Sequence, residues 1–400
     1  MKQVVELKVL PAEAANEQQL RARAAKKCQI PNAAVADFQL LRRSIDARGS
    51  RPFVRIRASI STKQESAEPS LLSSFQDVSD RPSVLIIGAG PAGYFAALEL
   101  IELGWKPIVL DRGKSVKERI SDIRAVQRFG QVNPNSNYCF GEGGAGTYSD
   151  GKLYTRSHKR GNIEKILRLL VEHGAQSDIL IDAHPHIGSN KLPKIVANIK
   201  ASILAYGGEV HFGKKVTDFI LHKDKVKGVI VNEQETYYAD ALVLATGHSA
   251  RDIYRILDQK KIAMEAKPFA LGVRIEHPQA LIDEIQYNQK PREEHLPASS
   301  YKLVSQVKGR GVFSFCMCPG GLIVPASTAP GEIVVNGMSL SKRDSPFANS
   351  GTVVGIEKED LKAYSDRFGV FASVEFQKSV EQKIFQNGNG SQQAPAQRLN

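Results

Sequence analysis

The chain has 400 residues and a net charge of +12, with 42% hydrophobic and 24% charged residues, which predicts two or three globular domains and excludes fibrous or low-complexity proteins. No apolar run approaches the roughly 18 residues of a membrane helix, and four cysteines are too few for a disulfide framework, so we expect a cytoplasmic protein without integral membrane association. The positive charge favours anionic partners, such as phosphates, nucleotides or nucleic acid, without choosing among them.

The first sixty residues are predicted to form a small α+β domain, a ferredoxin-like βαββ unit. Apolar and charged residues alternate over 5–9, as in a half-buried strand, and Pro11 begins a helix that runs to about Lys27. Two further strands are expected at 38–46 and 53–60. Arginines of these strands and of the turn between them form either an anion-binding patch or a solvated sheet face: Arg42, Arg43, Arg48, Arg51, Arg55 and Arg57.

The rest of the chain divides by composition. Residues 61–82 are rich in Ser, Glu and Pro and predict a linker. Residues 83–262 alternate short apolar strands with helices, which is typical of an α/β domain with a parallel sheet. The strand-like runs FALGVRIE, YKLVSQV, GVFSFCM, GLIVPAS and EIVVNGM predict an inserted, antiparallel or mixed-sheet substrate domain over 263–355. Residues 356–400 predict a helical tail.

The strongest signal is VLIIGAGPAG at 84–93, where a buried strand turns through glycines into a helix. Gly88 permits the tight turn, Gly90 lets a pyrophosphate approach the backbone, and Gly93 lets the helix pack closely on the strand. A second strand ends at Asp111, whose carboxylate is placed to accept hydrogen bonds from a ribose and to repel a 2′-phosphate. These features predict a Rossmann-like dinucleotide site in which NADP is disfavoured.

Three features favour FAD over NAD in this site. The chain carries one such fingerprint, so no separate NAD(P) Rossmann domain is expected. The strand DALVLATG ends in Ala245-Thr246-Gly247 and, with the hairpin before it, resembles the adenine-contacting region of two-dinucleotide-fold flavoproteins. The loop at 139–156, CFGEGGAGTYSDGKLYTR, is rich in small residues, which either let backbone lie against a planar ring or form an ordinary turn.

Five blocks of the sequence carry a more specific resemblance: GEGGAGTYSDGKL, HPHIGSNKL, ATGHSARD, FCMCPGG and NGMSLSKRD. They resemble the signature blocks of a bacterial family of FAD-dependent dehydrogenases, also described as NAD(P)/FAD-dependent oxidoreductases, with no assigned substrate. The resemblance implies an α/β fold similar to the glutathione-reductase-like FAD group, in the branch of geranylgeranyl reductases and aromatic hydroxylases. It covers nearly the whole chain, including the small amino-terminal domain.

By matching position, the resemblance implies contacts with each part of FAD. The implied contacts are Gly88, Gly90, Ala92, Gly93, Thr246 and Gly247 at the phosphates, Asp111 at the ribose, Val216 at the adenine, Gly143, Gly144, Ala145, Gly146 and Thr147 along the flavin, and the neighbouring residues Pro91, Arg112 and Ala245.

The chain departs from the family pattern in two places. HPHIGSNKL has Ser189-Asn190 where the family has Thr-Asp, so a local carboxylate is lost. After NGMSLSKRD we predict only polar helices, at 357–368 and 373–386, without the glycine-rich segment that completes the FAD site of the family. We therefore expect an exposed cleft at the flavin end, while the adenine end of FAD is still recognised.

The catalytic candidates are histidines and cysteines in these blocks. His184, His186 and His248 could act as general acids or donate to the flavin, or could serve as structural hydrogen-bonding residues, and His248 is preferred because it follows the Ala-Thr-Gly motif. Cys316 and Cys318 lie two apart on a predicted strand, so both thiols are expected on one face, either as a redox pair or as pocket-lining residues. No metal-binding pattern is evident.

The sequence thus predicts a cytoplasmic FAD-dependent oxidoreductase, with NAD(P)H as a transient electron donor and an unknown small-molecule substrate. An RNA-modifying flavoprotein is an alternative, suggested by the net charge and the arginine-rich first domain. A degenerate, non-catalytic FAD-binding module is a third hypothesis. The oligomeric state stays open.

Overall fold

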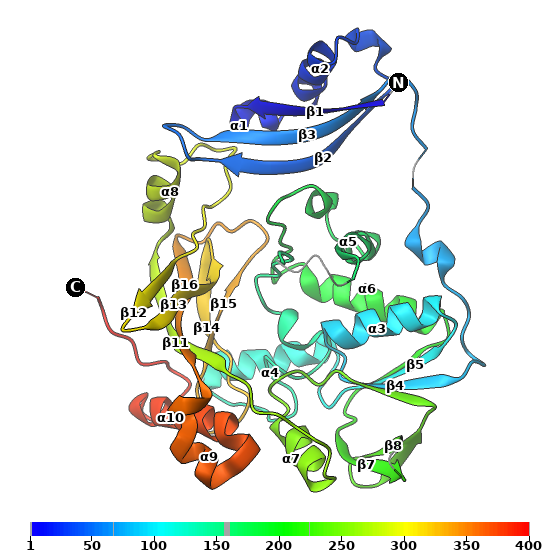
Figure 1. Cartoon of the computed structure of the whole chain (residues 1–400), viewed down its shortest axis with the longest axis vertical. Coiled ribbons are helices and arrows are strands. Elements are labelled where there is room, and N and C mark those ends of the chain that lie inside the picture. The colour runs from blue at the N-terminus through cyan, green and yellow to red at the C-terminus, as the bar shows by residue number, and fades with distance from the viewer. Residues whose placement is uncertain (1, 67, 156–160, 224, 400) are drawn as a thin grey trace.

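The computed structural model describes residues 2–66, 68–155, 161–223 and 225–399. It has three parts, each built on its own sheet (Figure 1). The amino-terminal sheet lies at one end of the long axis. Below it, the α/β part with the parallel sheet and the sheet-rich part with antiparallel strands lie beside each other, and the carboxy-terminal helices lie at the opposite end (Figure 1).

The amino-terminal part is a three-stranded antiparallel sheet with helices on one face. Its elements are β1 (Lys2–Val9), α1 (Pro11–Ala14), α2 (Glu17–Lys27), β2 (Asp37–Asp46) and β3 (Phe53–Ser61). The βαββ order is as predicted, with β3 in the centre of the sheet and its alternate apolar residues buried against α2. The prediction of a single helix is wrong, because the helical segment is interrupted at Asn16. The Asn16 side chain accepts a hydrogen bond from Gln19 N and caps the start of α2.

Residues 83–262 form the predicted α/β part around a four-stranded parallel sheet. The elements of this sheet and its connections are β4 (Ser83–Ile87), α3 (Pro91–Glu102), β5 (Lys106–Leu110), α4 (Val116–Phe129), α5 (Ile163–Glu172), α6 (Leu192–Ala205), β6 (Glu209–His211) and β10 (Ala241–Leu244). The strand order is β10-β4-β5-β6. Ile86 packs under α3, α5 and α6, whereas Leu85 and Ile87 face a second core on the other side. Burial on both faces explains the unbroken apolar run of β4.

An antiparallel layer and one helix build that second core. They are β7 (Val216–His222), β8 (Lys225–Val231), β9 (Glu235–Tyr238) and α7 (Arg251–Gln259). Val229, Val231 and Ile253 are buried together with Leu85. The layer contains the expected hairpin, formed by β7 and β8, and β9 adds a third strand to it. The segment before β7 forms β6, which pairs with β5 in the parallel sheet.

Residues 269–356 form a sheet-rich part, in which all pairings are antiparallel among the described residues. Its elements are β11 (Phe269–Pro278), α8 (Gln279–Tyr287), β12 (Val304–Val307), β13 (Arg310–Cys318), β14 (Gly321–Pro325), β15 (Val335–Ser339) and β16 (Phe347–Ile356). The main sheet has the order β11-β16-β13-β12. The sequence prediction omitted β16, because its first half is dominated by small and polar residues. Asn349 and Ser350 in that half are nevertheless 0% exposed.

The two predicted polar helices near the carboxy end are confirmed as α9 (Lys362–Phe368) and α10 (Ala372–Asn387). Arg251 of α7 donates to Glu381 of α10 over 3.0 Å and to Glu332 over 2.8 Å, so one buried ion cluster ties the α/β part to the last helix. Within the described ranges, no strand after β10 joins the parallel sheet. None of the helices in those ranges is both long enough and apolar enough to cross a bilayer.

Candidate cofactor and substrate sites

The turn between β4 and α3 has the close approaches that its glycines predict. A Cβ on Gly88, where φ is +111°, would lie 2.4 Å from the carbonyl oxygen of Ala245, and a Cβ on Gly93 would lie 1.9 Å from the carbonyl oxygen of Gly88. Pro91 begins α3, so the free N–H groups of its first turn face the end of the parallel sheet. The Ala-Thr-Gly motif therefore packs directly on the first glycine.

Asp111 fixes this turn from the neighbouring strand. Its Oδ2 accepts from Ala89 N over 2.9 Å and its Oδ1 from Gly113 N over 2.8 Å. Burial raises the pKa of Asp111, and the two backbone N–H groups oppose that effect. Each carboxylate oxygen keeps a further lone pair, so the group can hold the turn and still accept from a ribose hydroxyl.

A hollow at the carboxyl ends of β4 and β5 brings together several predicted adenosine contacts. Its lining includes Gly88, Asp111, Arg112, Val216 and Thr246. Phe140 also lines it, and the Arg112 guanidinium lies 4.5 Å from the centroid of that ring. The lining combines apolar side chains with Arg112, Lys214 and Asp111, and the acid is placed to accept from a ribose.

The predicted flavin loop lies beside the same turn. Gly143 N donates to the Ala89 carbonyl over 2.8 Å, and a Cβ on Gly144 would lie 3.1 Å from the Cα of Gly90. Thr147 closes the loop by donating from Oγ1 to the Glu142 carbonyl over 2.9 Å. Two glycine-rich segments, more than fifty residues apart in the sequence, thus form one backbone surface.

Arg119 of α4 is a residue that the sequence analysis missed. It is 0% exposed, its Nε donates to the Asn137 carbonyl and its Nη1 to the Glu142 carbonyl, both over 2.8 Å, while Nη2 has no partner among the described residues. Burial lowers the pKa of Arg119. A sequence signal existed, because Arg119 falls on the apolar stripe of α4 with Val116 and Ile123.

A buried cation with a free donor is costly unless a ligand completes it. Arg119 Nη1 holds the Glu142 carbonyl, at the start of the loop that contacts Gly90. The unpaired Nη2 fits an anionic group of a dinucleotide.

Four of the five sequence blocks meet at a second place, where the α/β part contacts the sheet-rich part. Asp150 Oδ2 accepts from Arg343 Nη2 over 2.6 Å and from Lys152 Nζ over 3.1 Å, and Asp150 also accepts from the Ser339 hydroxyl. Lys152 Nζ lies 3.4 Å from the sulfur of Cys318. We call these residues, with His186, the four-block cluster: Asp150, Lys152, His186, Cys318, Ser339 and Arg343.

Electrostatics in the four-block cluster follow from its burial and its cations. Burial alone would raise the pKa of Asp150, but Arg343 and Lys152 hold it below its ordinary value. Burial and Arg343 lower the pKa of His186, which leaves this imidazole neutral at pH 7. His186 Nε2 lies 3.1 Å from the Ser341 carbonyl, which can only accept, so the ring proton resides on Nε2.

The regular strand pattern on which the shared face of Cys316 and Cys318 was predicted is interrupted in the structure. The register of β13 shifts between Phe315 and Cys318, and Cys316 adopts a left-handed backbone with φ of +45°. Cys316 is exposed, whereas Cys318 is 1% exposed, and both are free thiols. Cys318 contacts Lys152 of the four-block cluster, whereas Cys316 lies near the same cation but is not hydrogen-bonded to it in the described part of the chain.

The remaining histidine candidates lie elsewhere. His184 packs on the Tyr154 ring with a centroid distance of 4.8 Å, near the four-block cluster but outside its contacts. His248, the preferred catalytic candidate, is exposed, and its Nε2 lies 3.4 Å from the Ser249 hydroxyl. No contact of the four-block cluster within the described ranges involves His248. In the same ranges, no group of three or more His, Cys, Asp or Glu residues is placed to hold a metal ion.

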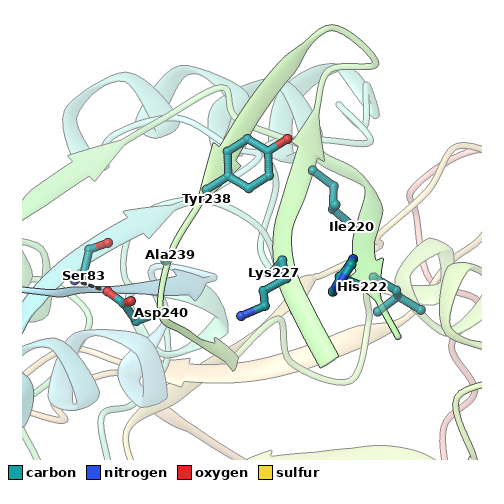
Figure 2. A pocket seen from close by; sticks show the side chains of 8 residues that line it. Ser83, Ile220, His222, Lys227, Tyr238, Ala239 and Asp240 are labelled. Carbon is teal, nitrogen blue, oxygen red and sulfur yellow. Dashed lines mark hydrogen bonds between the residues drawn. The ribbon is translucent and has the colours of Figure 1, made fainter. Parts of the chain in front are cut away.

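Another open hollow in the α/β part is not placed to serve the cofactor (Figure 2). Its lining includes Lys227, Tyr238 and Asp240, and Ser83 N donates to Asp240 Oδ2 over 3.2 Å. Ser83 begins β4 and Asp240 precedes β10, so this hollow lies at the amino ends of parallel strands. Ligands of open α/β sheets bind outside the carboxyl ends.

Three families match parts of the chain. Residues 82–262 match the family described as pyridine nucleotide-disulphide oxidoreductase, and residues 268–400 match the one described as FAD-dependent protein, C-terminal domain-like. Residues 1–61 match a domain of unknown function.

Individual proteins are similar over long stretches. A protein of Clostridium beijerinckii without a stated function is 38% identical over 390 residues, which are 93% of this chain and 72% of that protein. A thiamine thiazole synthase of Methanococcus maripaludis is 24% identical over 218 residues, 52% of this chain and 71% of the synthase. The solved structure of CmlS, a flavin-dependent halogenase, is 16% identical with a TM-score of 0.35, over 79% of this chain and 48% of that one.

Proposed function

We propose that this chain, which belongs to the family of FAD-dependent oxidoreductases that includes the clostridial protein, binds FAD non-covalently and passes electrons from NAD(P)H to a small-molecule acceptor. When bound, the isoalloxazine ring would supply the two-electron chemistry. One observation carries the proposal: the Gly143–Thr147 loop lies against Gly90, beside a buried Arg119 nitrogen that lacks a partner among the described residues.

Each part of the cofactor has a proposed holder in this chain. The turn from Gly88 to Gly93 and the first N–H groups of α3 would bind the pyrophosphate, and Arg119 Nη2 would donate to one of its oxygens. Asp111 would accept from a ribose hydroxyl while it holds Ala89 N and Gly113 N. The backbone at Val216 would lie along the adenine, and the Gly143–Thr147 loop along the flavin.

We further propose that substrate chemistry takes place at the four-block cluster rather than at His248. Because the His186 proton is held on Nε2 by the Ser341 carbonyl, Nδ1 carries a free lone pair that can accept a proton from a substrate. Asp150 holds Arg343 and Lys152 in place, and its lowered pKa keeps it ionised in that role. His186 is the proposed proton acceptor, and Asp150 is a positioning residue.

The alternative of an RNA-modifying flavoprotein receives less support from the amino-terminal arginines. Arg43 pairs with Asp182 over 2.7 Å, and Arg48 and Arg55 both pair with Asp46. Arginines whose charge is shared with carboxylates suit a solvated or docking face better than a continuous phosphate track. We keep the cytoplasm as the proposed compartment because the cysteines are free thiols.

Anaerobic titration tests this function. Protein loaded with FAD should lose the visible absorbance of its oxidised flavin when NADH or NADPH is added. The more effective nucleotide identifies the donor. Retention of FAD without reduction by either nucleotide would favour the non-catalytic module instead.

A further inference from the structure

The charges around Cys318 do not balance. Arg274 of β11 donates from Nη2 to the Cys316 carbonyl over 2.9 Å, and the same nitrogen lies 3.9 Å from the Cys318 sulfur. Lys152 Nζ lies 3.4 Å from the same sulfur, so two cations flank this thiol, and Arg343 is a third cation that joins them through Asp150. Among the described residues, Asp150 is the only carboxylate that pairs with any of them. Two positive charges stay uncompensated, and an ionised Cys318 would still leave one.

A buried amide beside these cations also lacks a partner. Asn349 is 0% exposed and lies opposite Cys318 in the register of β13 and β16. Its Oδ1 accepts from Arg274 Nε over 3.1 Å, but its Nδ2 has no hydrogen-bond partner among the described residues. A buried N–H donor without an acceptor costs free energy that a bound acceptor would recover.

Two strained backbone positions hold this arrangement. Cys316 has φ of +45° and Arg343 has φ of +52°, both in the left-handed region that residues with a Cβ seldom adopt. The two segments meet, because a Cβ on Gly320 would lie 1.9 Å from the Arg343 carbonyl oxygen. Such strain often accompanies a functional site.

Positive charge continues around the cluster. Lys302 Nζ lies 4.2 Å from the centroid of the Tyr154 ring, which in turn packs on His184. Burial lowers the pKa of His184, and nearby cations add to this effect: Lys302, Arg42 and Arg343. Solvent reaches the cations around Cys318 from one side, since the Lys152 side chain is 33% exposed and Cys316 is exposed.

We propose that Lys152, Arg274 and Arg343, together with Asn349 Nδ2, bind an oxyanion of the substrate, a carboxylate or a phosphate. The donors in this group are cations and N–H groups, and an oxyanion supplies both the charge and the acceptors that they lack. That the bound oxyanion belongs to a substrate rests on the proposed function. Binding of the oxyanion itself can be measured without turnover. The substrate class is thus a small acid or a phosphate ester.

Calorimetric titration of the FAD-loaded protein tests the site. Pyrophosphate and succinate are the probes, so that saturable binding of one or the other assigns the phosphate or the carboxylate class. Arg274→Met and Lys152→Met should each weaken that binding by about ten- to a hundredfold. Arg48→Met is the matched control, because it removes the same charge from an 80% exposed side chain and should leave binding unchanged.

The outcomes separate this inference from the proposed function. Absence of saturable binding of both probes to FAD-loaded wild type, or an equal loss in all three variants, would overturn the oxyanion site. If Arg274→Met does not fold, Lys152→Met decides the question, since that side chain is partly exposed. FAD content is read from the same samples by absorbance, so failure to bind FAD is recognised independently.

Discussion

Replacement of Arg119 by methionine separates a cofactor contact from a structural role. Arg119→Met keeps most of the apolar stem and removes the guanidinium, whose Nη2 has no partner among the described residues. One charge-assisted hydrogen bond contributes about 1.5–3 kcal/mol, so the FAD dissociation constant should rise about 10- to 150-fold.

The change also affects the FAD-free protein. The Asn137 carbonyl loses its side-chain donor, at a cost of about 1–3 kcal/mol, whereas the Glu142 carbonyl keeps the hydrogen bond from Thr147. Removal of a fully buried cation opposes that cost. The informative quantity is therefore the stabilisation that FAD adds, obtained from thermal unfolding with and without FAD and from quenching of flavin fluorescence. Arg124→Met, an exposed position on the same helix, is the matched control. An unchanged FAD dissociation constant in Arg119→Met, with lower stability of the FAD-free protein, would refute the cofactor role.

Three further predictions concern the turn, the acid and the thiols. Gly90→Ala should fold, since its Cβ would lie 3.8 Å from the nearest atom, but its FAD affinity should fall by about tenfold or more. Gly93→Ala should instead lower the stability of the fold. Equal FAD binding by Gly90→Ala and wild type would argue against a pyrophosphate at Gly90. The folded-state pKa of Asp150 lies below 3.8, so its contribution to folding stability is complete above that pH and is lost as the pH falls through the folded-state pKa. Asp150→Asn should therefore lower the melting temperature more at pH 7 than at pH 3. An equal decrease at both pH values would contradict this prediction. Cys316 should react with iodoacetamide well before Cys318, and full reduction should take about two electrons per flavin, whereas about four would revive the redox pair.

Local patterns predicted the glycine turn between β4 and α3 well. The apolar run of β4, the three glycines and Asp111 lie within thirty residues of one another, and each constraint acts through backbone close to it in the chain. The same holds for the central strand of the amino-terminal sheet, whose alternation is set by one buried face.

The parts that sequence reasoning missed depend on distant contacts. The strand β16 carries Asn349 and Ser350 where a buried strand usually carries branched apolar residues. Both side chains form hydrogen bonds across the sheet, Asn349 with Arg274 and Ser350 with the Phe315 carbonyl. The bulge between Phe315 and Cys318 cannot be predicted from the alternation of apolar and polar residues in the sequence. The four-block cluster was present as separate motifs, but only the tertiary fold brings Asp150 to Arg343.

Equilibrium binding of FAD to the purified chain tests the central claim most directly. Titration should show one FAD per chain with a dissociation constant in the micromolar range or below, as expected for a pyrophosphate and a ribose held by several charge-assisted bonds (on the order of 8 kcal/mol or more). NAD should not displace it at comparable concentration. A colourless protein that takes up no FAD at micromolar concentration, or one that binds NAD in preference, would contradict the account.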